Sequence, residues 1–398
     1  MTDVTAAATR RRGASQRRRI LTWVAAIGLL SCWGCGAGAD TPPAASNVAI
    51  AVETGTLDGA DFRIDLPANW NHALVVFYHG YAVTPVRLPA REPLAPHLRQ
   101  LADRGYAVIQ SAYSATGWAL EQAQSDSERL RNHFIGKHGK PRETIAVGLS
   151  MGGTLTVMAL ETAPETYAGG LSLCGAIESS ERLLQHDFAL VAAFDYYFPG
   201  LLGALVPAAP DFLPTPAIEA KIAAALRANP PAAESLLRIW GVGNQQTLVD
   251  IIAFNYFEIG ELQRRAHGNP FNNADYIYTG SKDAFALNAG VKRYRADPAA
   301  AAYLARWYTP SGNLQRPLLA LHDTGDPLVP ASGAFDFALA VQHSGHADNF
   351  VQQFVNKDGH CVFTPEEIGH AFDELVGWMH DSKRPVSGLL PAPGKAKD

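Results

Sequence analysis

The chain has 398 residues, of which 47% are hydrophobic and 18% charged, and its net charge at pH 7 is −5. This composition can bury a large core and excludes an intrinsically disordered chain. Residues 1–39 hold six arginines and one acid, a local charge of +5, which leaves −10 on the rest. The residues after 39 are thus strongly acidic and contain no basic stripe, which argues against a nucleic-acid partner.

Residues 1–39 have the organisation of an export signal. The arginines precede an apolar run over residues 20–30, shorter than the roughly 20 residues that a membrane-spanning helix needs. Arg17-Arg18-Arg19-Ile20-Leu21 resembles a twin-arginine signal, with the general export route as the alternative. We therefore expect a periplasmic or secreted protein, with a cytosolic protein that carries a basic arm as the alternative.

Two processing sites compete at the end of this leader. Ala37-Gly38-Ala39 fits the small-residue rule for cleavage before Asp40, which would give a soluble protein. Leu29-Leu30-Ser31-Cys32 resembles a lipobox, which would leave a lipid on Cys32. Both stay open, and a lipid on Cys32 is the one membrane attachment that we expect.

After a linker over residues 40–47, apolar runs of strand length alternate with helical segments. A continuous apolar run such as Leu74–Tyr78 is typical of a strand buried on both faces of a parallel sheet. Strands are expected at 48–52, 62–66, 74–78, 106–110, 144–148, 170–174, 317–321 and 349–355, and helices at 94–104, 120–138, 151–161, 331–343 and 365–379. This alternation predicts an α/β protein with a mostly parallel sheet and flanking helices.

The alternation stops near residue 177 and resumes at residue 317. The interruption, residues 179–300, has helical periodicity and predicts a helical cap inserted late in the sheet. Residues 48–178 and 301–384 then form the core, and residues 385–398 are expected to be a loose tail.

Gly148-Leu149-Ser150-Met151-Gly152 matches the G-x-S-x-G pattern of a nucleophile elbow. It stands between a predicted strand and a predicted helix, the context that this pattern requires. Small neighbours are needed because the serine occupies an unfavourable backbone conformation on a tight turn. Ser150 is the candidate nucleophile, and an ordinary glycine turn is the alternative.

A serine hydroxyl needs a base, and the chain offers one after its last strand. His360 follows Asp358-Gly359, and Asp326 follows the strand at 317–321. The order Ser150, Asp326, His360 is that of α/β hydrolases rather than of chymotrypsin or subtilisin.

Together these features resemble the α/β-hydrolase superfamily, in its esterase/lipase or prolyl-oligopeptidase-like branch of secreted bacterial type. The resemblance covers about residues 70–180 and 315–380. The motifs that carry it are His79-Gly80, the Ser150 elbow, H-x-x-x-D-x-x-V-P from His322, and Gly359-His360. It implies an α/β-hydrolase fold and a Ser-His-Asp triad that works without a cofactor.

The resemblance also implies a role for each residue. Ser150 attacks the acyl carbon, and His360 takes its proton and then protonates the leaving group. Asp326 orients the imidazole, because it occupies the family's position before a Val-Pro pair. Asp323 is a rival acid and Glu366 a remote one.

Two further features follow from this fold. Backbone N–H groups of Met151 and Tyr81 are expected to form an oxyanion hole. Cys174 and Cys361 should both lie near the carboxyl edge of the sheet, where an exported protein would join them in a disulfide. Two buried free thiols are the alternative.

Other signals are weaker. Tyr113 and Trp118 follow a strand end and could line an acyl pocket, with packing as the alternative. His343 and His346 are too small a set for a metal site, and the H-E-x-x-H pattern does not occur, so no metal is expected. Gly241-Val242-Gly243 lacks the rest of a dinucleotide fingerprint.

We therefore interpret the chain as a carboxylic ester hydrolase acting on a small or polymeric ester with an apolar acyl or aromatic part. A peptidase or amidase of the same fold is the first alternative, because it could use the same triad. A non-catalytic binding protein on this fold is the second, since fold alone does not decide function.

Overall fold

The computed structural model describes residues 48–391, so the predicted leader, both processing sites, the linker and residues 392–398 lie outside the described part. The strands are β1 (Ile50–Leu57), β2 (Ala60–Pro67), β3 (Ala73–Tyr78), β4 (Ala107–Ser111), β5 (Glu143–Leu149), β6 (Gly169–Leu173), β7 (Leu318–Gly325), β8 (Phe350–Asp358) and β9 (Gly388–Leu389). The helices are α1 (Pro96–Asp103), α2 (Leu120–His138), α3 (Met151–Thr162), α4 (Ser180–Tyr197), α5 (Pro216–Ala228), α6 (Pro230–Trp240), α7 (Gln245–Arg265), α8 (Ala284–Gly290), α9 (Pro298–Arg306), α10 (Gly333–His343) and α11 (Pro365–Asp381), with a 3-10 turn η1 at Ala347–Asn349.

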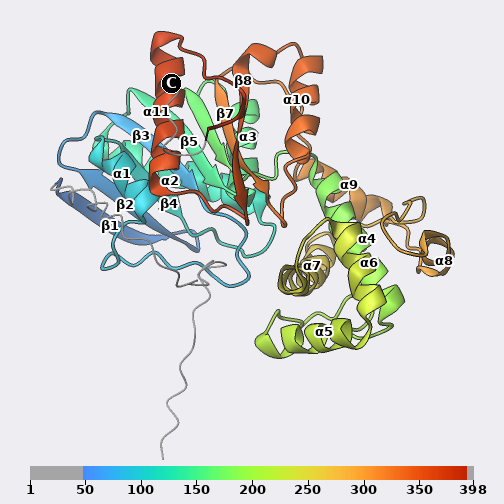
Figure 1. Ribbon diagram of the computed structural model, residues 1–398. Helices are drawn as coiled ribbons and strands as arrows, with labels where there is room; N and C mark the ends of the chain where they lie inside the picture. Colours follow the sequence, from blue (N-terminus) through green and yellow to red (C-terminus); the bar gives the residue numbers. More distant parts are fainter. Residues whose placement is uncertain (1–47, 392–398) are drawn as a thin grey trace, which may run out of the picture.

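The strands of the described residues form one sheet in the order β1-β2-β4-β3-β5-β6-β7-β8-β9 (Figure 1). β2 runs antiparallel to both β1 and β4. Every other neighbouring pair, from β4-β3 to β8-β9, is parallel. The predicted α/β class with a mostly parallel sheet is confirmed.

Side chains alternate across the central strand β3, in which every residue is buried. Val75 and Phe77 belong to the cluster that includes side chains of α1 and α11, whereas Leu74 and Val76 belong to the cluster of α2 and α3. Full burial of an aliphatic side chain is worth about 1.5–3 kcal/mol. Because helices cover both faces, the strand has no polar side, which explains its continuous apolar sequence.

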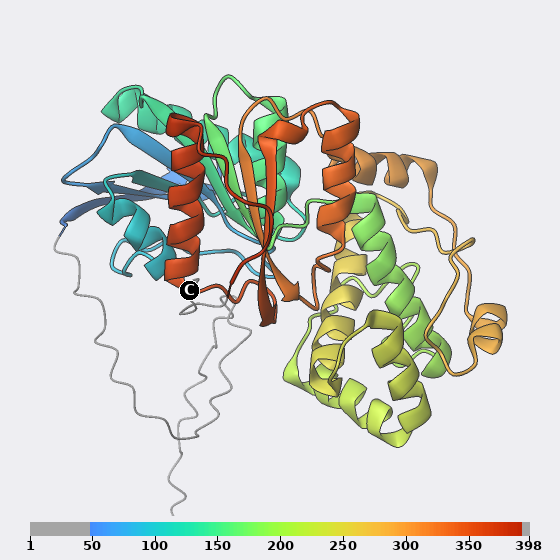
Figure 2. The same cartoon turned by 45° about the horizontal axis from the view of Figure 1, so that its top comes forward.

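Helices α4 to α9 lie between β6 and β7 in the chain and gather beside the sheet as a cap (Figures 1 and 2). The helical insertion runs on to Arg306, slightly past the expected boundary at residue 300. Helix α7 is buried over most of its length and packs against α4, α5 and α6.

The C-terminal region differs from the expected loose tail. Gly388 and Leu389 pair with Gln353 and Phe354, so β9 extends the sheet by one short strand. Two residues are too few to leave a periodic pattern in the sequence. Among residues 48–391, every helix is too short or too polar to cross a bilayer.

Candidate active site

Ser150 occupies a sharp turn between β5 and α3. Its backbone has φ 57° and ψ −123°, a conformation that costs a non-glycine residue free energy. The turn is also crowded. A side chain on Gly148 would collide with the carbonyl oxygen of Gly152, and one on Gly152 with that of Tyr78. The glycines of the G-x-S-x-G pattern are therefore required by close backbone contacts.

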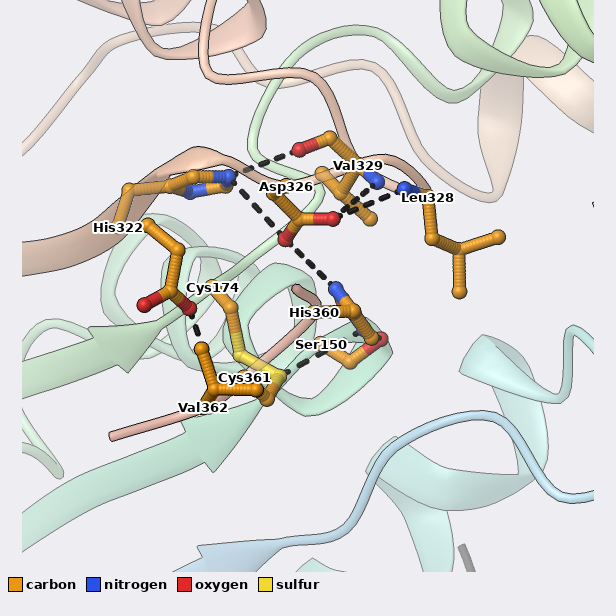
Figure 3. Close-up of a disulfide and its surroundings, with 10 residues drawn as sticks. Ser150, Cys174, His322, Asp326, Leu328, Val329, His360, Cys361 and Val362 are labelled. Carbon is orange, nitrogen blue, oxygen red and sulfur yellow. Dashed lines mark hydrogen bonds and ion pairs between the residues drawn. A yellow bond between two sulfur atoms is a disulfide. The ribbon is translucent and has the colours of Figure 1, made fainter. Parts of the chain in front are cut away.

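The structure brings the three predicted side chains into one hydrogen-bonded chain (Figure 3). Nε2 of His360 lies 2.8 Å from Oγ of Ser150. Nδ1 of His360 lies 2.7 Å from Oδ2 of Asp326. In this arrangement Nδ1 donates its proton to the carboxylate, which leaves Nε2 free to accept the serine proton.

The carboxylate of Asp326 is fully buried and held from both sides. Its Oδ1 accepts backbone N–H groups of Leu328 and Val329, each at 2.9 Å. Nε2 of the buried His322 lies 3.6 Å from Oδ2 and donates to the carbonyl of Val329 at 2.9 Å. Burial lowers the pKa of His322, which favours its neutral form beside Asp326.

The two rival acids have other partners. Oδ2 of Asp323 accepts the backbone N–H of Val362 at 3.2 Å, and burial raises the pKa of Asp323 to about 7. Glu366 is exposed in the first turn of α11. Among these acids, Asp326 is the one hydrogen-bonded to His360.

The loop after β3 passes directly beside Ser150. A Cβ added to Gly80 would lie 3.2 Å from Cβ of Ser150. The Gly80 carbonyl accepts a hydrogen bond from Nδ1 of His79 at 2.7 Å. Because a trans peptide points its C=O and N–H in opposite directions, this bond turns the N–H of Tyr81 away from His79. Met151 begins α3, so its N–H lacks an intrahelical acceptor.

Tyr113 supports this loop. Its ring stacks on His79 at 3.9 Å between centroids, and its hydroxyl donates to the His79 carbonyl at 3.2 Å. Burial also lowers the pKa of His79 to about 4, which keeps it neutral. The sequence motif His79-Gly80 was a signal for the loop, but no pattern pointed to Tyr113 as its support.

Trp118 lies in the packing between core and cap. It is 4% exposed, and its indole N–H donates to the carbonyl of Trp307 at 3.0 Å. Its backbone N–H donates to the Glu261 carboxylate on α7 at 3.2 Å. These contacts favour the packing alternative over a role in an acyl pocket.

The predicted disulfide between Cys174 and Cys361 is present (Figure 3). Cys174 follows β6, and its N–H donates to the carbonyl of Leu321 in β7. The bridge therefore ties the loop that carries His360 to the centre of the sheet. It spans 187 residues, and closing a loop of that length in the unfolded chain corresponds to about 5 kcal/mol on the chain-entropy model.

The cap contacts the site at two loops. Tyr81 makes edge contacts with Phe254 and Phe257 of α7, at 5.2 and 6.4 Å between ring centroids. The indole N–H of Trp240 in α6 donates to the carbonyl of Pro327, one residue after Asp326, at 2.7 Å. Apolar side chains of the cap thus lie beside the loop that follows β3.

The cap also buries a pair of carboxyl groups. Asp187 in α4 and Glu258 in α7 are hydrogen-bonded to each other and to no lysine or arginine of the described residues. Asn255 donates to Asp187 at 3.2 Å. Burial raises the pKa values of both groups. The charge of Glu178 raises that of Asp187 further, and the charges of Asp187 and then Glu261 raise that of Glu258. The two groups can therefore share a proton.

A separate cleft of about 1020 Å³ lies between the β4–α2 loop and the end of α7. Its lining includes Tyr113, Gln122, Arg264, Arg265 and Tyr303 but neither Ser150 nor His360. This cleft is therefore separate from Ser150 and His360.

The strand order and the serine turn after β5 are those of the α/β-hydrolase fold, which confirms the predicted fold. No protein-family model and no curated protein sequence matches the chain.

Many solved structures are similar to it at low identity, and three of them serve as examples. An acylaminoacyl peptidase of Pyrococcus horikoshii aligns over 83% of this chain and 41% of its own, with 13% identity and a TM-score of 0.45. An esterase of Pyrococcus furiosus aligns over 88% and 96%, with 13% identity and a TM-score of 0.45. A puromycin hydrolase mutant aligns over 87% and 42%, with 14% identity and a TM-score of 0.44. The chain spans less than half of the two longer proteins.

Proposed function

We propose that this chain is a serine hydrolase that cleaves carboxylic esters through an acyl-enzyme intermediate. The observation that carries the proposal is the unbroken hydrogen-bond chain from Asp326 through His360 to Ser150. These side chains come from three distant loops, and the serine is held in a strained turn. A protein that only binds a ligand has no need of such an arrangement.

The reaction follows from the geometry. His360 takes the Ser150 proton at Nε2 while Oγ attacks the carbonyl carbon, and Asp326 stabilises the resulting imidazolium. The oxyanion is held by the N–H groups of Met151 and Tyr81. The tetrahedral intermediate then expels the alcohol, which takes the proton from His360. Water then attacks the acyl carbon while His360 takes its proton. The bond to Ser150 breaks, the acid leaves, and His360 returns the proton to Oγ.

Apolar side chains beside the oxyanion loop support an ester with an apolar acyl or aromatic part. Phe254 is half-buried against Tyr81, and Leu328 is half-buried two residues after Asp326. Amide cleavage uses the same triad, so ester preference must be tested directly.

The test is a series of nitrophenyl esters of increasing acyl length, assayed beside peptide anilides. We expect ester turnover that is lost in Ser150→Ala and kept in Ser125→Ala, an exposed serine on α2. Turnover of anilides alone would replace the esterase proposal with a peptidase. No turnover and no labelling of Ser150 by a fluorophosphonate would favour the binding-protein alternative.

We also propose that the enzyme works outside the cytosol. The Cys174–Cys361 disulfide supports this, because such bonds persist in oxidising compartments. The mass of the mature N-terminus is the test. A chain that begins at Asp40 would be soluble, one that begins at a lipidated Cys32 would be anchored, and an intact leader on a cytosolic protein would contradict export.

A further inference from the structure

The disulfide lies against the proposed catalytic imidazole. Cys361 directly follows His360, and its Sγ is 3.5 Å from Nε2 of that histidine. The two sulfur atoms and an imidazole nitrogen all lie within 4.8 Å of one another (Figure 3). Two cysteines and one histidine are a ligand set typical of zinc.

Reduction would turn these atoms into three free ligands. A dithiol transfers two electrons and two protons to the bridge, which breaks the S–S bond, leaves two thiols and oxidises the dithiol to a cyclic disulfide. The Cα atoms of Cys174 and Cys361 are only 5.3 Å apart, so the separated sulfurs stay close. With Zn–S near 2.3 Å and Zn–N near 2.0 Å, ligand atoms of a tetrahedral zinc site stand about 3.5–3.8 Å apart. The present 3.5 Å between Sγ and Nε2 already matches that spacing.

The surroundings of His360 also suit a metal ligand. A histidine that binds a metal through one nitrogen usually donates the other N–H to a carboxylate, which fixes the ring. Nδ1 of His360 makes such a bond to the buried Asp326 at 2.7 Å. The contact that orients the ring for proton transfer would thus equally orient it for a metal.

We propose that the reduced chain binds one zinc ion through Cys174, Cys361 and His360, and that this ion switches the enzyme off. The two thiols release their protons on binding, so the thiolates neutralise the ion. Zinc then occupies the Nε2 lone pair that would accept the Ser150 proton. In the oxidised chain the sulfurs are bonded to each other, and Nε2 of His360 keeps its hydrogen bond to Ser150. The proposed inhibition by zinc rests on the proposed function, whereas the proposed zinc binding does not.

The experiment compares oxidised protein with protein that has been reduced by a dithiol and freed of it by anaerobic gel filtration. Zinc content after equilibrium dialysis should be one ion per reduced chain and none per oxidised chain. Cobalt(II) should give a thiolate charge-transfer absorption in the reduced chain alone. Ester turnover of the reduced enzyme should fall at least 100-fold with one equivalent of zinc and return with a chelator.

Variants assign the ligands. Cys174→Ser with Cys361→Ser should abolish stoichiometric zinc binding, with circular dichroism as the check on folding. Asp326→Asn should weaken zinc about 10–100-fold, as loss of an outer-shell partner does. Ser150→Ala should bind zinc normally, so the site can be measured even if the esterase proposal fails.

Two results would overturn the inference. A folded, reduced wild-type chain that has two titratable thiols but binds no zinc would contradict the proposed zinc site. Stoichiometric zinc binding with undiminished ester turnover would contradict the proposed inhibition.

Discussion

Replacing Gly80 by alanine tests how closely the proposed oxyanion loop approaches the nucleophile. The added Cβ would lie 3.2 Å from Cβ and 3.7 Å from Oγ of Ser150, and 3.3 Å from the carbonyl oxygen of Leu149. Carbon atoms normally pack at about 3.5–4.0 Å. The loop must therefore move away by a few tenths of an ångström, and the N–H of Tyr81 moves with it.

The size of the effect follows from the role of that N–H. Complete loss of one oxyanion donor costs about 10²–10³ in kcat. Displacing the donor should lower kcat less than losing it altogether, so we predict that kcat of Gly80→Ala falls about 10–100-fold. KM should change little, because the donor acts mainly on the transition state. Overpacking of this kind costs about 1–3 kcal/mol of folding free energy, which a stable chain tolerates.

The assay is steady-state ester hydrolysis together with thermal unfolding. Gly136→Ala is the matched control, because Gly136 lies exposed in α2 and an added Cβ there meets nothing within 4 Å. It should keep full activity and gain about 0.5–1 kcal/mol of stability. Full kcat in a folded Gly80→Ala enzyme would refute the placement of the oxyanion hole on this loop.

Three further predictions concern the supports of the site. Asp326→Asn should lower kcat about 10⁴-fold in the ester assay, because the amide favours the wrong imidazole tautomer. Asp323→Asn should lower kcat far less. Equal losses of kcat in the two variants would count against Asp326 as the residue that orients His360. Tyr113→Phe removes one hydrogen bond of about 0.5–1.5 kcal/mol behind the oxyanion loop, so kcat should fall roughly 2–10-fold, and an unchanged kcat would separate Tyr113 from that loop. The pKa values of Asp187 and Glu258 are raised in the folded chain, so at pH values above the ordinary carboxyl pKa range the folded chain binds more protons than the unfolded chain. The stability that this pair contributes is therefore full at lower pH and is lost as the pH rises. Glu258→Gln should therefore raise the Tm at pH 8 and flatten its pH dependence, whereas an unchanged pH dependence would exclude the shared proton.

Much of the fold could be predicted because its signals are local. The buried strand β3 shows as an apolar run, and α11 begins at residue 365 as predicted, with Thr364 as its N-cap in a capping box with Glu367. The glycines around Ser150 mark a turn that only small residues allow. Periodicity and turn chemistry of this kind depend on neighbouring residues, so a single sequence carries them.

The supports of the site could not be predicted, because they are contacts between distant segments. Nothing near Tyr113 indicates that its ring will stack on His79. Likewise, the bond from Trp240 to the loop of Asp326 joins residues 87 positions apart. Such contacts depend on how the cap packs on the sheet, and periodicity does not record that packing.

The most direct test of the proposed catalysis is the mass of the intact protein after treatment with a fluorophosphonate, followed by peptide mapping. We predict one adduct per chain, on Ser150, formed at a rate that falls by orders of magnitude in His360→Ala. An adduct on another residue, or equally fast labelling of Ser150 without the imidazole, would contradict activation of this serine by His360.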